Sequence, residues 1–215
     1  MTTDWGQWHR DYDQPNSSLA QRLQVVQHYL RQALTEITSS QPGQQQLISI
    51  CAGDGRDVLP VLAAHHTTRR VRALLVELDP RLANRARTTA IQLGLHAVTV
   101  RTTDAGITDV YTDIAPAHVV LACGVFGNIT TKHVKRTIAT LPRLLTGGGV
   151  VIWTRGRPSN EPDPSLDIRT WLASHGFTEL SFTAPTNAKF RVGIHRLDTP
   201  ATDPLAPGTQ MFAFT

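Results

Sequence analysis

Two stretches decide the fold of this chain: Leu47 to Asp57, LISICAGDGRD, and Leu74 to Pro80, LLVELDP. Each begins with an apolar run typical of a buried strand, and the first continues into a glycine turn that opens a helix. Gly53 and Gly55 allow a tight turn and a close approach to a ligand, because residues without a Cβ tolerate positive φ. Glu77 follows about 20 residues further on, the spacing at which an acidic side chain ending the second strand meets ribose hydroxyls. The two stretches therefore indicate a nucleotide-cofactor site.

The same alternation of strands and helices continues along the chain. The predicted strands are 47–51, 71–77, 97–101, 118–123 and 150–153, and the predicted helices are 55–65, 80–93, 131–145 and 164–175. This order favours a mainly parallel, doubly wound α/β sheet, whose ligands lie at the carboxyl ends of the strands. A length of 215 residues with 40% hydrophobic content suits one large domain.

The two ends of the chain are less uniform. Apolar residues recur at helical spacing between Leu19 and Ile37, with Asn16, Ser17 or Ser18 as the N-cap. Near the other end, 178–183 and 210–214 have the pattern of two closing strands that would pair antiparallel. The segment 189–197 is an alternative last strand, and periodicity does not choose between them.

A series of motifs runs along the chain: the glycine turn, Glu77, the segment Thr103 to Gly106, the strand that ends at Cys123, and a glycine turn leading to Trp153. This series resembles the class I S-adenosylmethionine-dependent methyltransferases. The resemblance implies a Rossmann-like domain with a seven-stranded, mainly parallel sheet and an antiparallel C-terminal hairpin. It also implies residues 47–215 as the cofactor-binding part, and S-adenosylmethionine as cofactor, with S-adenosylhomocysteine as product. Residues 1–40 are predicted to be an N-terminal arm and helix forming a lid, because the arm carries two tryptophans in a stretch otherwise too polar to form core.

Roles for single residues follow from the resemblance. Glu77 would bind the ribose hydroxyls, Leu78 would pack on the adenine, and Asp104 would accept a hydrogen bond from the adenine amino group. Tyr12 would reach the methionine carboxylate, although a solvent-facing hydroxyl is an equal alternative. The full set of implied cofactor residues is Tyr12, Ala52, Gly53, Asp54, Gly55, Glu77, Leu78, Asp104, Ala105, Cys123 and Gly124.

The acceptor side has fewer signals. Methyl transfer from a sulfonium is an in-line displacement, so the protein mainly positions the acceptor and excludes water. His9 and His195 are the candidates for removing a proton from the acceptor. Trp5 and Trp8 form a lid or simply pack on the surface, with equal support. The candidate substrate residues are Trp5, Trp8, Phe126, Asn128, Trp153 and Arg155.

Composition and sequence motifs limit the partners that we expect for this protein. The net charge of +4 comes from scattered arginines, and the segment after the fourth strand, 123–128, lacks the proline-aromatic motif common in base-modifying methyltransferases. Methylation of a nucleic acid is therefore disfavoured, and a small-molecule acceptor is expected. The chain shows no paired-carboxylate metal motif and no apolar run of membrane-spanning length, and its N-terminus is polar. These features predict a metal-independent, cytoplasmic protein that does not bind a membrane; its oligomeric state is not predicted.

Two alternatives remain open. An NAD-type dinucleotide-binding oxidoreductase would use the same glycine turn and Glu77, but Val58 stands in place of its third glycine and Asp104 would have no role. A non-catalytic S-adenosylmethionine-binding protein would keep the cofactor residues and lack an acceptor site.

Overall fold

A seven-stranded sheet forms the centre of the computed structural model, which describes Gln14, residues 17–157 and residues 162–214. The strand order is β3-β2-β1-β4-β5-β7-β6; β1 to β5 run parallel, and β7 runs antiparallel to both β5 and β6. The strands are β1 (Gln45–Ile50), β2 (Val71–Glu77), β3 (Val98–Thr102), β4 (Ala117–Ala122), β5 (Leu145–Gly156), β6 (Phe177–Thr183) and β7 (Phe190–Leu197). The predicted doubly wound fold with an antiparallel C-terminal hairpin is confirmed.

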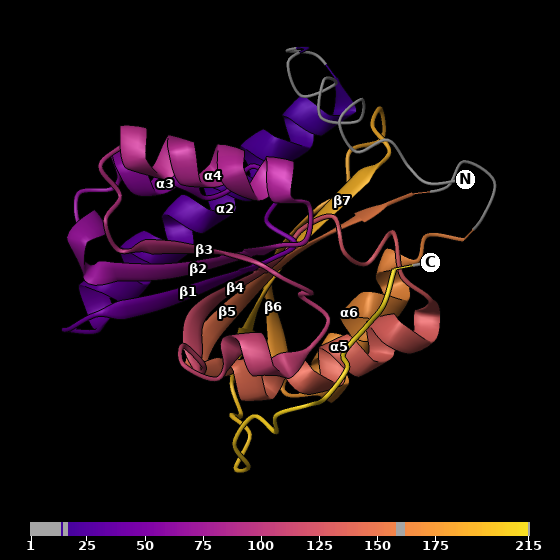
Figure 1. Cartoon of the computed structure of the whole chain (residues 1–215). Coiled ribbons are helices and arrows are strands. Elements are labelled where there is room, and N and C mark those ends of the chain that lie inside the picture. Colours follow the sequence, from indigo (N-terminus) through magenta and orange to yellow (C-terminus); the bar gives the residue numbers. More distant parts are fainter. Residues whose placement is uncertain (1–13, 15–16, 158–161, 215) are drawn as a thin grey trace.

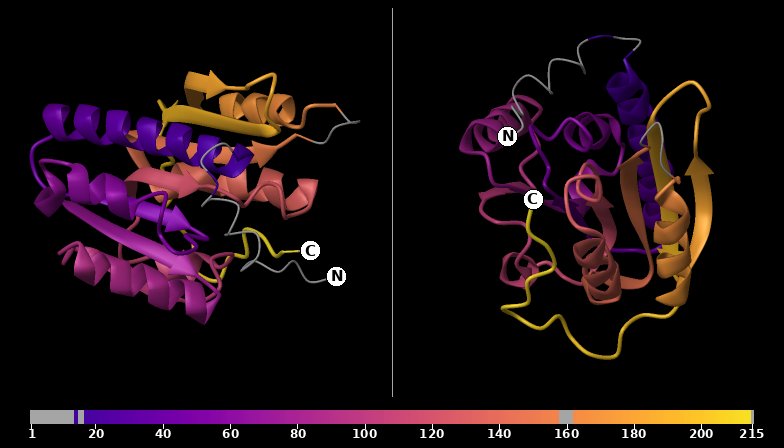
Figure 2. Two further views of the ribbon diagram at one scale, coloured as in Figure 1. Left: turned by 90° about the horizontal axis from the view of Figure 1, so that it is seen from above. Right: turned by 90° about the vertical axis from the view of Figure 1, so that its right-hand side faces the viewer.

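Helices cover both faces of the sheet (Figures 1 and 2). The helices are α2 (Ser18–Ser40), α3 (Leu59–Ala64), α4 (Pro80–Gln92), α5 (Thr131–Leu144) and α6 (Ser165–Ser174), with short 3-10 turns η2 (Thr68–Arg70) and η3 (Thr108–Tyr111). One hydrophobic core lies beneath α2, α3 and α4, and a second core lies beneath α5 and α6. Because β1, β2 and β4 are central and covered on both sides, they are largely apolar and mostly buried.

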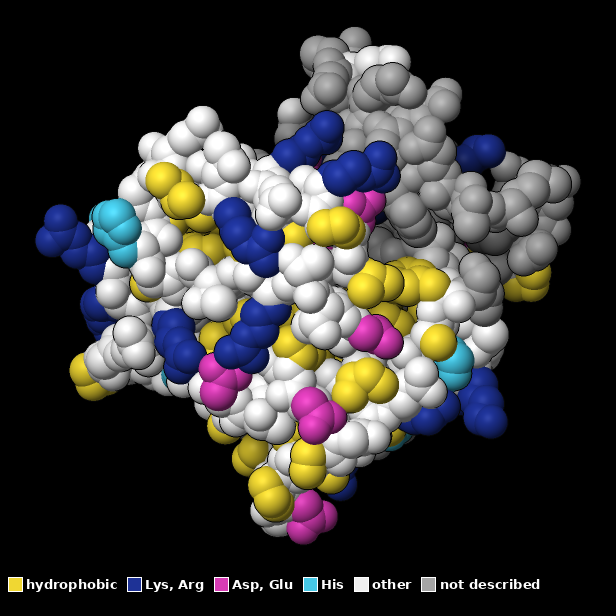
Figure 3. Space-filling view, viewed as in Figure 1, with side chains coloured by type: hydrophobic (Ala, Val, Ile, Leu, Met, Phe, Trp, Pro, Cys, Tyr) yellow, Lys and Arg dark blue, Asp and Glu magenta, His cyan; other side chains and the backbone are white. Residues whose placement is uncertain are grey.

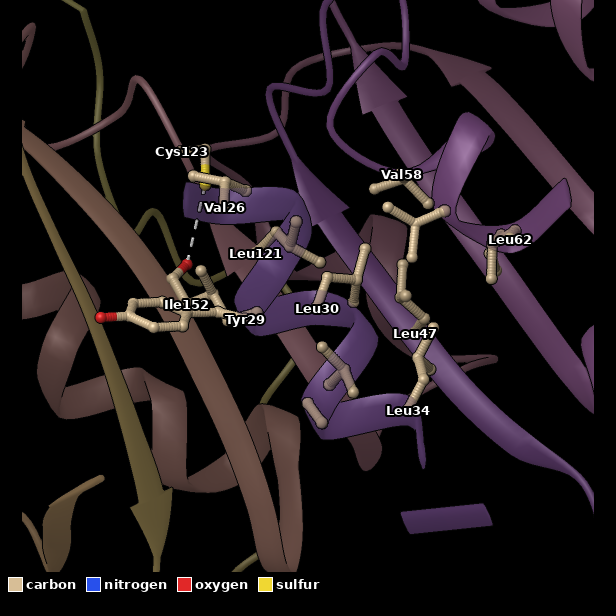
Figure 4. Close-up of a cluster of buried hydrophobic side chains, with 14 of the residues drawn as sticks. Val26, Tyr29, Leu30, Leu34, Leu47, Val58, Leu62, Leu121, Cys123 and Ile152 are labelled. Atoms are coloured by element: carbon tan, nitrogen blue, oxygen red, sulfur yellow. Dashed lines mark hydrogen bonds between the residues drawn. The ribbon is translucent and has the colours of Figure 1, made fainter. Parts of the chain in front are cut away.

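The N-terminal helix α2 is part of the first core. Ser17 is the N-cap, and its hydroxyl accepts a hydrogen bond from the Ala20 N–H at 3.0 Å. Val26, Leu30 and Leu34 recur at intervals of one turn and are fully buried against the sheet (Figure 4). Tyr29 lies on the same face, and its hydroxyl is 2.9 Å from Ser181 Oγ in β6. The amphipathic pattern seen in the sequence is therefore the packing face of α2.

The last strand differs from the first expectation. The segment 190–197 forms β7 between β5 and β6, whereas 210–214 forms only isolated bridges, from Gln210 to Ile107 and from Phe214 to Ile129. Gly193 explains part of this choice, because a Cβ there would lie 2.5 Å from the ring of Trp153 on β5. Only a strand with glycine at that register position can pair with β5 beside the buried indole.

Beyond β7 the chain leaves the sheet and returns across the α5 side, where it is drawn in yellow in Figure 1. Among the helices that the structure describes, none combines the length and apolarity needed to cross a membrane.

Candidate cofactor and acceptor site

The glycine loop follows β1 at the carboxyl edge of the sheet. Gly53 and Gly55 have φ of 58° and 80°, so both occupy the left-handed region that favours glycine. A Cβ on Gly55 would also lie 2.6 Å from Leu59 Cδ1, and the loop therefore packs closely on the start of α3. The loop is tied to the neighbouring strand by the Ala52 N–H, which donates to Val76 O at 2.9 Å.

Glu77 at the end of β2 is joined to the glycine loop. Its Oε2 accepts from the Gly53 N–H at 2.7 Å, and its Oε1 accepts from the Asp79 N–H at 2.8 Å. An ionised carboxylate offers about four acceptor positions, so these two bonds leave roughly two for other donors. The half-buried side chain is thus held in place while retaining capacity for hydroxyl groups.

The loop after β3 carries Asp104 and Ala105. Asp104 is exposed, and its Oδ1 accepts from the Gly106 N–H at 2.7 Å. The carbonyl of Ala105 accepts a hydrogen bond from the buried Tyr111 hydroxyl at 2.7 Å, and burial raises the pKa of Tyr111 so that it remains a donor. These bonds fix the loop while leaving the second carboxylate oxygen of Asp104 toward solvent.

Cys51 shows how closely the three loops approach. It follows β1 with φ of 53°, and its pKa is raised first by burial and then by the negative charges of Glu77 and Asp104. The thiol therefore stays protonated. The loops after β2 and β3 adjoin each other directly, since the Thr103 N–H donates to Glu77 O at 3.2 Å. Leu78, the next residue after Glu77, is 60% exposed. The face of the molecule drawn in Figure 3 carries hydrophobic, basic and acidic side chains interspersed.

The loop after β4 is fixed to β5. The Gly124 N–H donates to Thr154 Oγ1 at 2.8 Å, and Asn128 Nδ2 donates to Gly124 O at 2.7 Å. Arg155 reaches across from β5 and donates to Phe126 O. Asn128 and Arg155 therefore shape this loop through their polar groups.

Two residues expected to contact the substrate and one expected to contact the cofactor are buried inside the protein. Phe126 and Trp153 are fully buried in the core beneath α5 and α6, where their rings are 6.2 Å apart. Cys123 is 7% exposed and packs beneath α2 (Figure 4). The predicted contacts of Phe126 and Trp153 with a substrate are therefore wrong, because their hydrophobicity is used in the core. Only the backbone of Cys123 lies near the loop after β4.

His195 is also a core residue and not a base at the strand ends. It lies on β7 with 1% exposure, opposite Val151 in the interior of β5. Trp153 Nε1 donates to its Nδ1 at 3.3 Å, and burial lowers its pKa from 6.5 to about 4. Its Nε2 lies 3.4 Å from Glu179 Oε2. A neutral histidine enclosed in this way has no access to an acceptor, and the proposed catalytic role is withdrawn.

The remaining predictions concern Asp54, the aromatic N-terminal arm and the absence of a metal site. Asp54 forms an ion pair with Arg56, with Arg56 Nη2 2.5 Å from Asp54 Oδ2. The aromatic arm, with Trp5, Trp8, His9 and Tyr12, lies outside the described residues. The described part of the chain contains no group of three or more His, Cys, Asp or Glu residues placed to hold a metal ion.

Sequence reasoning missed two features of this edge. Arg22 is 7% exposed on α2; burial and then Asp57 raise the pKa of the Cys123 thiol, and the charge of Arg22 opposes them. A lone arginine on an apolar helix stripe, one turn before Val26, was the signal in the sequence. The second feature is the C-terminal tail, where the Met211 N–H donates to Gly106 O at 2.7 Å beside the Asp104 loop.

Comparisons with known proteins agree with this geometry. A family model described as "Putative methyltransferase" matches residues 17–175. A search of the curated proteins returned no match. Among solved structures, magnesium protoporphyrin IX methyltransferase from Synechocystis PCC 6803 with bound S-adenosylmethionine is similar, with a TM-score of 0.66, 17% identity and 91% of each chain covered. An O-methyltransferase family protein from Burkholderia thailandensis has a TM-score of 0.59 and 14% identity, with 81% of this chain and 57% of that chain covered.

Proposed function

The chain belongs to this methyltransferase family, within the class I S-adenosylmethionine-dependent methyltransferases, and we propose that it transfers a methyl group from S-adenosylmethionine to a small-molecule acceptor without a metal ion. The observation that carries the proposal is the arrangement of Glu77. Its carboxylate joins the glycine loop to the end of β2 and keeps acceptor positions for two ribose hydroxyls.

The adenosine half of the cofactor fits the ends of β2 and β3. The exposed side chain of Leu78 offers an apolar surface for the adenine ring, and Asp104 offers a carboxylate oxygen for the adenine amino group. The Ala105 N–H is the proposed donor to the adjacent ring nitrogen. A dinucleotide oxidoreductase would leave Asp104 without a role.

The methionine half fits over the glycine loop. Ala52, Gly53, Asp54 and Gly55 supply its floor, with Gly124 on the β4 side. We add Arg22 to this group as a partner for the methionine carboxylate, because it is a mostly buried cation on α2, and α2 contacts the glycine loop through Gln27 Nε2, which donates to Arg56 O at 2.9 Å. Tyr12 remains a further proposed partner from outside the described residues.

The bound sulfonium would supply an electrophilic methyl group, and the residues of the chain would position it. Glu77 and Asp104 orient the adenosine, and the β4 loop fixed by Asn128 and Arg155 forms the wall toward the acceptor. His9 is the remaining candidate for proton removal, and the arm with Trp5 and Trp8 is proposed to exclude water.

A small-molecule acceptor is favoured over a nucleic-acid base. Enzymes that modify a flipped base stack it between aromatic or apolar side chains, and the aromatic residue of the β4 loop, Phe126, is fully buried. The described part of this loop therefore offers no ring for stacking.

Calorimetry with S-adenosylmethionine, S-adenosylhomocysteine and NAD tests the cofactor. We expect binding of the first two and none of NAD; the reverse would support an oxidoreductase. Incubation with radiolabelled S-adenosylmethionine and a small-molecule cell extract then tests turnover. Cofactor binding without transfer to any extract component, in the presence of the full chain, would favour a non-catalytic binding protein.

A further inference from the structure

Four cationic side chains share one face of the β5–β7 pair at its site end. Arg155 on β5 lies directly opposite Arg191 on β7. One step beyond the last registered pair, the Arg157 N–H donates to Lys189 O at 2.6 Å, so these two residues are also opposite each other. Because side chains alternate between faces along a strand, Arg155 and Arg191 belong to one face, and residues 157 and 189, one residue beyond the ends of β5 and β7, continue the same register.

This face adjoins the loop after β4. Trp153, two residues before Arg155, lies in the core beneath α5 and α6, which identifies the side of the sheet. Arg155 donates to Phe126 O, and a Cβ on Gly127 would lie 3.7 Å from Arg155 Nη1. The row of cations therefore begins under the β4 loop and continues outward along β5 and β7.

The inner cations are bound to other groups of the protein, whereas the outer pair has no carboxylate partner among the described residues. Arg191 is 4% exposed, and its Nε lies 2.6 Å from Asp163 Oδ2. Arg157 and Lys189 are exposed, and no carboxylate among residues 17–157 and 162–214 forms an ion pair with either. Like charges directly opposite on paired strands destabilise the pair, and a bound anion would relieve that repulsion.

We propose that Arg157 and Lys189 bind an anionic group of the methyl acceptor, which is therefore a small molecule of net negative charge bearing a carboxylate or phosphate. This inference rests on the proposed function. In the proposed site the adenosine half of the cofactor lies at the ends of β2 and β3, so the acceptor lies toward the ends of β4 and β5. Arg157 and Lys189 lie on the outer side of the proposed acceptor position. A guanidinium binds a carboxylate or phosphate through two parallel hydrogen bonds, and an ammonium adds a point charge.

A nucleic acid would be a different partner with the same charge. Nucleic-acid affinity comes from many phosphate contacts, whereas this row offers two cations without a carboxylate partner in the described part of the chain. The geometry favours one anionic group of a small molecule.

The experiment separates a small-molecule cell extract by anion exchange at neutral pH. Each fraction is incubated with the full-length protein and radiolabelled S-adenosylmethionine. We expect methyl transfer only with the retained, anionic fraction. Arg157→Gln and Lys189→Gln should each reduce that transfer at limiting acceptor by about tenfold, and should leave the affinity for S-adenosylhomocysteine unchanged. Arg69→Gln, an exchange of a basic residue at η2 outside the site, serves as the matched control.

The outcomes separate this inference from the proposed function. Transfer confined to the unretained fraction, or equal transfer by Arg157→Gln and the control, would refute the anion site and leave the methyltransferase proposal standing. Absence of transfer from every fraction would contradict both. Glu161, outside the described residues, is the alternative internal partner of the cations: if Glu161→Gln lowers transfer as much as Arg157→Gln does, the cations belong to an internal ion pair and the anion site is refuted. Transfer to purified RNA but not to the extract would replace the small molecule by a nucleic acid.

Discussion

Glu77 connects local structure to cofactor affinity at the scale of a single residue. Replacing it with alanine removes the acceptor for the Gly53 N–H and the proposed acceptor for two ribose hydroxyls. We expect Glu77→Ala to weaken S-adenosylhomocysteine binding by about 1.5 to 3 kcal/mol, the range for hydrogen bonds to a charged group. Calorimetry would detect this as a roughly ten- to hundredfold higher Kd.

The control for this variant is Glu36→Gln, because Glu36 is an exposed carboxylate on α2. Both variants should remain folded, as judged by circular dichroism. Equal affinity of folded Glu77→Ala and the wild type would exclude Glu77 from the cofactor site.

His195 makes stability depend on pH. Its pKa is about 4 in the folded protein and 6.5 when unperturbed, because burial disfavours the charged ring. The unfolded chain therefore binds the proton first as pH falls, so the free energy of unfolding decreases from pH 6.5 down to about 4 and this contribution then levels off. The shift corresponds to a loss of up to about 3 kcal/mol.

Urea unfolding of the wild type and His195→Gln across this pH range measures the effect. Glutamine keeps an acceptor for Trp153 and does not titrate, so the variant should lose less stability than the wild type as the solution is acidified. Parallel pH curves for the two proteins would show that His195 is not the titrating group.

At the scale of elements, the turn between β1 and α3 depends on Gly55. Its φ of 80° strains any residue with a Cβ, and a Cβ would also meet Leu59 and Leu75. Gly94 has φ of 66°, and a Cβ there would have no atom within 4 Å, so a substitution at Gly94 measures the backbone cost alone. We expect Gly94→Ala to cost about 1 kcal/mol in unfolding free energy and Gly55→Ala about 2 to 4. Equal losses in urea titrations would show that the loop does not depend on close packing.

The elements of the parallel sheet could be predicted because their signals are local. The glycine turn before α3 and the carboxylate ending β2 lie within short segments, and the structure has both as expected. The last strand could not be predicted in this way. Both 190–197 and 210–214 are apolar enough, and the decision depends on the space that Gly193 gives to Trp153, a contact between strands far apart in sequence.

The prediction of acceptor-binding residues was wrong for a related reason. Phe126, Trp153 and His195 have the chemistry of a binding site, but sequence alone does not tell which face of a strand or loop is buried. The structure places all three in the core, where Trp153 Nε1 donates to His195 Nδ1. Arg22 is the opposite case. It interrupts the apolar stripe of α2, and it lies near the site.

At the scale of the whole molecule, the C-terminal tail connects the two halves of the carboxyl edge. After leaving β7 it bonds to the β3 loop through Gly106, and it then passes α5, where the Ala213 N–H donates to His133 Nδ1 at 3.2 Å. Its last described residue, Phe214, bridges to Ile129 after β4. The tail therefore joins the proposed adenine loop to the proposed acceptor loop.

Phe212 tests this connection because it is fully buried and its carbonyl lies against Gly106. Phe177 is 4% exposed in the same core, at the start of β6 and away from the site, and provides a matched control. Either phenylalanine changed to alanine should lose about 3 to 5 kcal/mol of unfolding free energy. Only Phe212→Ala should also weaken S-adenosylhomocysteine binding, by about three- to tenfold, because the loop of Asp104 loses its support. If both variants bind the product equally well below their Tm values, the tail contributes stability to the fold and no support to the cofactor site.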